Sequence, residues 1–115
     1  MSLDPQHASV RSNLFGGEGT VTTWSGLPPN ATPFSAAIWC ELSPSGRIGA
    51  HRQQRDSEIL IGVEGSGNIE VGQQRHVLKR GSVVYVPFGE SLQIRNQSTT
   101  DPLTYVIVKA QGSHA

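Results

Sequence analysis

Short apolar segments separated by turn residues are the feature that most constrains the fold of this chain. Thirteen glycines and seven prolines interrupt its 115 residues, and few apolar residues recur at the 3.6-residue period of a helix. The segments between the turns are rich in β-branched and aromatic residues, as strands are. Turn signals about every 8 to 12 residues are typical of sandwiches and small barrels. We therefore predict an all-β fold of roughly nine or ten strands.

The pattern places one barrel domain at residues 18–110, between an N-terminal arm and a C-terminal tail. Residues 1–17 mix polar side chains without a period and offer little to bury, so we expect a flexible arm. Residues 111–115 form the tail. The expected strands are 20–24, 34–42, 47–53, 58–63, 68–71, 74–78, 82–86, 92–96 and 103–108.

The overall charge and the single cysteine limit the classes of partner. Nine Lys and Arg balance nine Asp and Glu, so no long-range field favours nucleic acid or an anionic membrane. The longest apolar runs, of four or five residues, are far shorter than the ~20 that cross a bilayer. Cys40 has no internal partner for a disulfide, and no N-terminal stretch reads as a secretion signal. We expect a cytoplasmic protein with no nucleic-acid or membrane partner.

One predicted strand is apolar on both of its faces. If Glu58 points into the barrel, Ile59, Ile61 and Val63 form an apolar outer face. The segment 83–86 repeats this pattern. Because an outer apolar face needs cover, we expect a homodimer.

Three polar residues could converge inside the barrel. His51 and Gln53 are two positions apart on one strand, so their side chains share a face. Glu58 follows a corner and could return beside them on the neighbouring strand. Barrels direct several metal ligands at one point in this way.

This spacing resembles the first motif of the cupin superfamily. That motif runs Gly, five residues, His, one, His, three or four, Glu, six, Gly. Here Ser45 takes the place of the first Gly and Gln53 that of the second His, while His51, Glu58 and Gly65 match.

The second cupin motif is also present, with one departure. It runs Gly, five, Pro, one, Gly, two, His, three, Asn, and the chain supplies Gly81, Pro87, Gly89, Leu92 in the His place, and Asn96. The resemblance implies a small single-domain cupin, a double-stranded β-helix or jelly-roll barrel.

The resemblance also implies a divalent metal, because cupins hold iron, manganese, nickel or zinc with the three His and the Glu. The corresponding set here is His51, Gln53 and Glu58, a weak site because an amide is a poorer donor and Leu92 has none. His76 could replace one missing ligand, although a locally hydrogen-bonded histidine is the commoner outcome.

Three functions remain open, and the sequence leaves enzyme status undecided. The first is a metal-dependent dioxygenase or isomerase at His51. The second is a metal-free isomerase or epimerase in which a His51 to Glu58 hydrogen bond forms an acid and base pair, with Tyr85 or Tyr105 as a second acid. The third is a non-enzymatic dimeric module that binds a small molecule.

The ligand pocket is expected around His51. Arg47 should share its strand face and could reach an anionic ligand. Apolar neighbours suit a ligand with a hydrophobic body. The expected pocket residues are Arg47, Leu60, Tyr85, Leu92 and Ile94.

Overall fold

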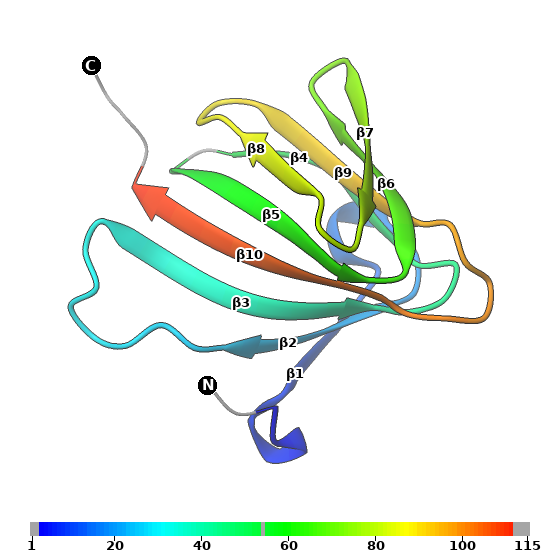
Figure 1. Ribbon diagram of the computed structural model, residues 1–115, viewed down its shortest axis with the longest axis horizontal. Coiled ribbons are helices and arrows are strands. Elements are labelled where there is room, and N and C mark those ends of the chain that lie inside the picture. Colours follow the sequence, from blue (N-terminus) through cyan, green and yellow to red (C-terminus); the bar gives the residue numbers. More distant parts are fainter. Residues whose placement is uncertain (1–2, 54, 112–115) are drawn as a thin grey trace.

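Two antiparallel sheets face each other in the computed structural model, which describes residues 3–53 and 55–111 (Figure 1). The larger sheet has the order β1 (Ser9–Ser12), β2 (Thr20–Ser25), β3 (Phe34–Leu42), β10 (Leu103–Gln111), β5 (Asp56–Glu64) and β8 (Val83–Val86). The smaller sheet has the order β4 (Arg47–Arg52), β9 (Ser91–Asn96), β6 (Ser66–Val71) and β7 (Gln74–Lys79). The predicted all-β jelly-roll barrel is confirmed.

Helix is limited to two 3-10 turns, η1 (Pro5–His7) and η2 (Leu14–Gly16). Among the described residues, no helix has the length and apolar character needed to span a bilayer.

Alternation along the strands builds the core between the sheets. On β5 the residues Glu58, Leu60 and Gly62 are buried and face inward, while Ile59 and Ile61 face outward. This is the facing predicted from the period of two. Both sheets contribute fully buried apolar side chains, among them Leu60, Ile69, Leu78, Leu103 and Tyr105.

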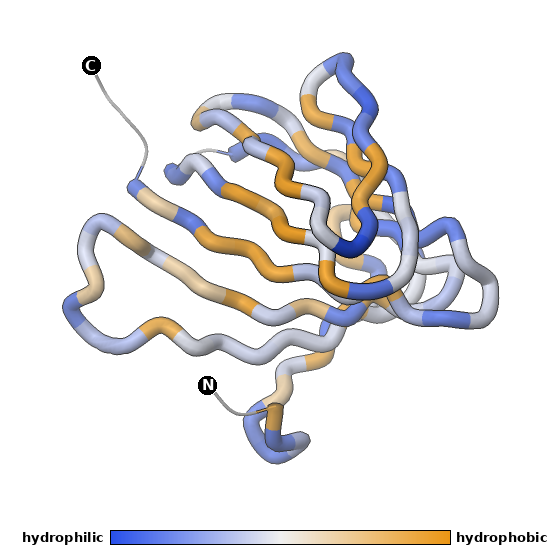
Figure 2. The backbone as a smooth tube through the Cα atoms, viewed as in Figure 1, coloured by the Kyte–Doolittle hydropathy of each residue, from blue (hydrophilic) through white to orange (hydrophobic). Residues whose placement is uncertain are grey.

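The outer face of the larger sheet is apolar as well. Figure 2 shows hydrophobic stretches along β5, β8 and β10. In the strand register Ile59 lies opposite Tyr85 and Val108, and Ile61 lies opposite Val83 and Val106. Trp39 of β3 extends this surface beside Val106. We call it the outer apolar face: Trp39, Ile59, Ile61, Val83, Tyr85, Val106 and Val108.

The segment expected to be an arm is largely part of the barrel. β1 pairs along its whole length with β2, and η2 then packs against β4. An added Cβ at Gly49 would overlap the carbonyl oxygen of Phe15, so this close approach requires glycine there. All four residues of β1 are exposed, which explains why no apolar pattern revealed the strand. Residues 1–2 and 112–115 lie outside the described part of the chain.

Two motif positions have structural roles away from the cavity. Ser45, in the place of the first motif glycine, keeps a left-handed backbone with φ of 58°. The Asn96 amide donates to the carbonyl oxygens of Leu42, Ser43 and Asp101 at 2.9 to 3.2 Å. Its own oxygen accepts from the Ser98 amide at 3.0 Å. Asn96 therefore ties the loop before β10 to the end of β3.

Candidate functional site

A cavity of about 380 Å³ lies inside the barrel, within the size range of small-ligand pockets. Its walls are mostly apolar and come from both sheets, with η2 contributing Leu14 and Phe15. The ionisable side chains that line it are Arg11 of β1, Cys40 of β3, His51 of β4, Glu58 of β5, and Tyr105 and Lys109 of β10.

Glu58 is paired with a lysine inside this cavity. The Lys109 ammonium nitrogen lies 3.8 Å from Oε2 of Glu58, and the two residues are cross-strand neighbours on β10 and β5. Glu58 is only 2% exposed, whereas the Lys109 side chain is 31% exposed. A buried carboxylate is costly unless a cation or donor compensates it, and Lys109 supplies that cation.

Burial raises the pKa of Glu58 above its ordinary value. The positive charge of Lys109 and the Gln53 amide both lower the pKa of Glu58 and so oppose this rise. The charge of Asp56 raises the pKa further. Even so, neither carboxylate oxygen makes a hydrogen bond of ordinary geometry with another described residue. Glu58 is thus a carboxyl group that takes up a proton more readily than one in water.

Two further buried polar groups lack a hydrogen-bond partner among the described residues, namely the Tyr105 hydroxyl and Nε2 of Gln53. Burial is the main cause that raises the pKa of Tyr105 well above its ordinary value, and interactions with Cys40 and Glu58 raise it further. Burial also raises the pKa of the Cys40 thiol to about 12, with a further rise from Glu58. Cys40 and Tyr105 therefore stay protonated at neutral pH.

His51 lies in the cavity wall but does not pair with Glu58. Its Nδ1 is 3.0 Å from the carbonyl oxygen of Gly49, and the Phe15 ring stacks on it with centroids 3.9 Å apart. Burial lowers the pKa of His51, partly offset by the Gly49 carbonyl. The predicted His51 to Glu58 hydrogen bond is absent, because Glu58 faces Lys109 instead.

The predicted pocket residues separate into three groups. Leu92 and Ile94 line the cavity, and Leu60 is fully buried in the core. Tyr85 is 61% exposed and faces outward, because the period of two on β8 buries Val84 and Val86. The prediction that Tyr85 lines this pocket is therefore corrected. Tyr85 instead lines a separate hollow of about 630 Å³ together with His76, which also lies away from the cavity.

Arg47 points away from the cavity because β4 contains a bulge. The pairing of β4 with β9 shifts register between Ile48 and His51, so the alternation expected between Arg47 and His51 is broken. Arg47 reaches the carbonyl oxygen of Gly16 at 3.2 Å and lies 3.9 Å from Glu18. The expected role for Arg47 at the mouth of the His51 pocket is thus corrected.

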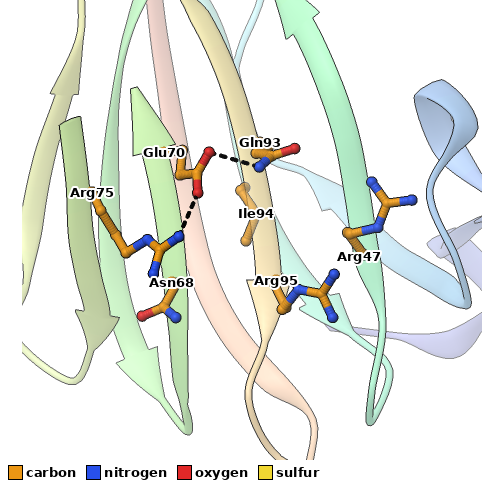
Figure 3. A pocket seen from close by; sticks show the side chains of 7 residues that line it. All are labelled: Arg47, Asn68, Glu70, Arg75, Gln93, Ile94 and Arg95. Carbon is orange, nitrogen blue, oxygen red and sulfur yellow. Dashed lines mark hydrogen bonds and ion pairs between the residues drawn. The ribbon is translucent and has the colours of Figure 1, made fainter. Parts of the chain in front are cut away.

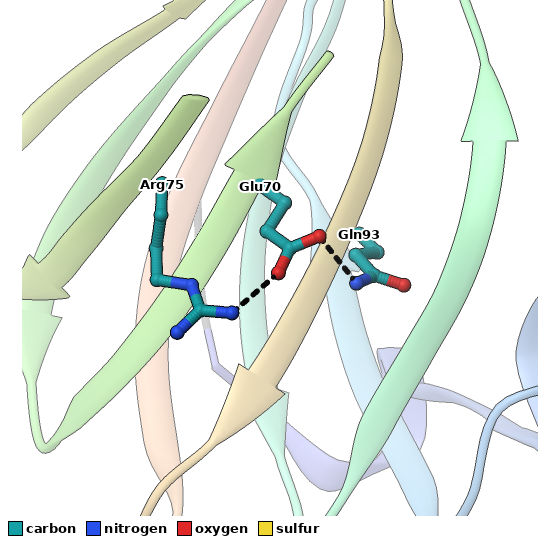
Figure 4. A network of polar contacts seen from close by, with 3 residues as sticks. All are labelled: Glu70, Arg75 and Gln93. Atoms are coloured by element: carbon teal, nitrogen blue, oxygen red, sulfur yellow. Dashed lines mark hydrogen bonds and ion pairs between the residues drawn. The ribbon is translucent and has the colours of Figure 1, made fainter. Parts of the chain in front are cut away.

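Arg47 instead borders a small hollow of about 80 Å³ on the outside of the smaller sheet, with Asn68, Arg75 and Arg95 among its neighbours (Figure 3). Glu70 occupies one side of this hollow. It accepts hydrogen bonds from Arg75 at 2.9 Å and from Gln93 at 2.8 Å (Figure 4). This network links three neighbouring strands, β7, β6 and β9, at the surface.

The family model described as the cupin domain matches residues 38–109, which is more than half of the chain. The chain belongs to the cupin family. A relative named oxalate-binding protein, from Thermotoga maritima, is 29% identical over 92 residues, covering 78% of this chain and 76% of the relative.

Solved structures show the same fold. The crystal structure of a predicted oxalate decarboxylase from Thermotoga maritima superimposes with a TM-score of 0.85 at 23% identity, covering 96% of this cupin and 99% of that chain. A cupin 2 conserved barrel domain protein from Salinispora arenicola gives a TM-score of 0.70 at 24% identity, with 94% and 85% covered.

The residues of this cupin do not fit a divalent metal ion. In the strand register Leu92 lies directly opposite His51, so the third histidine position presents an apolar side chain that is 2% exposed. The Glu58 carboxylate faces the Lys109 ammonium, whose charge repels a metal cation. Within residues 3–53 and 55–111, no group of three or more His, Cys, Asp or Glu side chains could hold a metal. The expected set of His51, Gln53 and Glu58 is not supported by this geometry.

Three cavity groups were missed in the sequence: Lys109, Phe15, and Arg11 in the segment expected to be an arm. Lys109 lies just past the predicted end of the last strand, although it continues the inward alternation of Tyr105 and Ile107. This alternation could have identified Lys109 as an inward-facing residue from the sequence. Phe15 lies in a segment without periodicity, and only the tertiary structure places it on His51.

Proposed function

We propose that this cupin binds a small polar molecule in the cavity beside His51, Glu58 and Lys109. The observation that carries the proposal is a mostly apolar cavity of about 380 Å³ on which a few polar groups converge. Buried polar groups without partners, such as the Tyr105 hydroxyl, are costly. A ligand that satisfied them would recover that cost.

The relative named oxalate-binding protein makes oxalate the first compound to test. The experiment is NMR titration of the isotope-labelled protein with a panel of oxalate, other small acids, neutral amides and simple sugars. At least one compound should shift the resonances of the cavity residues with a saturable dependence on concentration. If no member of the panel, charged or neutral, does so, the proposal is wrong.

A matched pair of variants identifies the cavity as the binding site. Thr23 lines the cavity, whereas Thr22 precedes it on the opposite face of β2. Thr23→Phe should fill the cavity and weaken binding at least tenfold, which corresponds to ~1.4 kcal/mol. Thr22→Phe should leave affinity unchanged. Equal loss in both variants would place the ligand elsewhere.

A second candidate function is metal-free proton transfer. It is favoured by the opposite pKa shifts of Glu58, raised mainly by burial, and His51, lowered mainly by burial. Such shifts bring an acid and a base toward similar pKa values, which suits general acid and base catalysis. Once a ligand is found, conversion of that ligand should disappear in Glu58→Gln. Binding without any conversion would instead identify a non-enzymatic binding module.

We also propose that a second copy of the chain covers the outer apolar face. An antiparallel sheet usually leaves one face polar, but here Trp39, Ile61 and Val106 are neighbours on adjacent strands of the outward side. Large exposed apolar surfaces mark interaction sites. The formal net charge of zero adds no repulsion between two identical copies. A symmetric homodimer would bury this face.

A further inference from the structure

The charges lining the cavity are unbalanced in favour of cations. Lys109 and Arg11 are the lysine and arginine among its lining residues, and Glu58 is the one acidic residue. The Glu58 carboxylate pairs with one of these cations, Lys109, so the lining as a whole carries an excess of positive charge. The cavity therefore has an unmet preference for an anion.

Hydrogen-bond donors in the cavity are similarly unmatched. The Tyr105 hydroxyl is fully buried, and although the Cys40 thiol interacts with it, it makes no hydrogen bond of ordinary geometry with a described residue. The Lys109 ammonium carries three donors, and it lies 3.8 Å from the Glu58 carboxylate, which is longer than a hydrogen bond. Both residues belong to β10 and share its inward face. Both residues line the cavity that a ligand would enter.

We propose that Lys109 takes the place of a metal ion in this cupin, and that the cavity binds a small carboxylate directly through the Lys109 ammonium and the Tyr105 hydroxyl. This inference rests on the small-molecule function proposed above and names the ligand class and the residue that anchors it. The ammonium supplies the positive charge, and the hydroxyl donates to a ligand oxygen.

Glu58 completes the arrangement by taking up a proton. Two carboxylates close together do not both stay ionised, so the entering carboxylate favours protonated Glu58. Where Glu58 is ionised before binding, a proton from solvent forms the new O–H bond on its carboxyl group, and no covalent bond of the ligand changes. The titratable groups that interact with Glu58 are Lys109 and Tyr105 from β10, Cys40 from β3 and Asp56 on its own strand. His51 of β4 and Arg11 of β1 line the same cavity. The protonated carboxyl can donate to the ligand.

The test compares oxalate with oxamide, its neutral diamide, by isothermal titration calorimetry. The chain has two lysines, so Lys79→Met, at an exposed position on β7, is the matched control for Lys109→Met. We expect Lys109→Met to weaken oxalate binding at least tenfold and to leave oxamide binding unchanged. Lys109→Arg should retain part of the affinity, because it keeps the charge, and Lys79→Met should behave as wild type. EDTA should have no effect on oxalate binding.

A second variant keeps the test decisive if loss of Lys109 unfolds the protein by leaving Glu58 unpaired. Lys109→Met with Glu58→Gln removes both charges together and should fold, but it should still fail to bind oxalate. Oxalate binding that EDTA abolishes, or that Lys109→Met leaves intact, would overturn the role of Lys109 while the small-molecule proposal stands. If oxamide or a sugar binds and oxalate does not, the proposal that the ligand is a carboxylate is wrong, whereas the small-molecule function stands. No binding by any compound tested would overturn both.

Discussion

The Phe15 ring stacks on the His51 imidazole with centroids 3.9 Å apart and an interplanar angle of 12°. Phe15 is nevertheless 55% exposed. Its backbone adopts a φ of 54°, a conformation that residues other than glycine rarely adopt. The neighbouring Gly17 and Gly49 let η2 approach β4 closely enough for this contact. η2 thus covers His51 at one wall of the cavity.

Removing this cover should hydrate His51. Because burial is the main cause of its lowered pKa, Phe15→Ala should move that pKa back toward the ordinary histidine value. Loss of the stacking should reduce the free energy of unfolding by about 0.5–1.5 kcal/mol. NMR titration of the imidazole and urea unfolding provide the two measurements. Phe34→Ala, at another half-exposed phenylalanine, is the control. An unchanged His51 pKa would contradict the covering role of Phe15.

Glu58→Gln should change how stability depends on pH. The folded-state pKa of Glu58 is raised, so above its ordinary value of 4.5 the folded protein holds a proton that the unfolded chain has lost. Wild-type stability therefore falls as pH rises through this window. Gln cannot ionise, so the variant should gain stability relative to wild type as pH increases. The lowered pKa of His51 acts in the opposite direction, but in both proteins.

Urea unfolding at several pH values between 4.5 and 8 measures this difference. Glu64→Gln, at an exposed position on the same strand, is the matched control and should follow wild type. If the difference in free energy of unfolding between wild type and Glu58→Gln stays constant across this pH range, Glu58 does not titrate as a buried group.

Restoring the two cupin histidines tests the incompatibility of Lys109 with a metal. Gln53→His with Leu92→His completes the ligand set, but Lys109 still faces Glu58. Adding Lys109→Met should raise zinc affinity at least tenfold over the double variant, because it removes a cation near the metal. Competition with a zinc chelator gives the affinities. Equal affinity in the double and triple variants would mean that Lys109 does not oppose metal binding.

Asn96→Ala should destabilise the barrel without affecting the cavity. The substitution leaves the carbonyl oxygens of Leu42, Ser43 and Asp101 without the Asn96 amide. We expect a loss of about 2–4 kcal/mol in the free energy of unfolding. Gln97→Ala, at the exposed neighbour, should cost little. Denaturant unfolding provides the comparison, and similar losses in both variants would contradict the structural role of Asn96.

Charge placed on the outer apolar face should separate a dimer. Ile61→Glu puts a carboxylate at the centre of that face, beside Val83 and Val106. Val77→Glu alters an exposed valine on β7 of the other sheet and serves as the control. Sedimentation velocity should give a dimer for wild type and for Val77→Glu, and a monomer for Ile61→Glu. A monomeric wild type would overturn the dimer.

The sequence determined every strand except β1, and it determined the facing of β5. Alternation of buried and exposed positions requires only local geometry, so Glu58 and Leu60 could be assigned inward while Ile59 and Ile61 were assigned outward. The two spaced motifs were sufficient to predict the barrel that joins them. The same two-residue alternation also predicts that Lys109 faces inward, because Lys109 follows Tyr105 and Ile107 at that spacing.

Only the tertiary structure decided which groups meet in the cavity. The bulge in β4 reversed the facing of Arg47 relative to His51, and an irregularity of one residue leaves no mark on hydrophobic periodicity. The stacking of Phe15 on His51 and the pairing of Lys109 with Glu58 join residues that are 36 and 51 positions apart. Such contacts depend on how the sheets close, and local sequence preferences do not encode that closure.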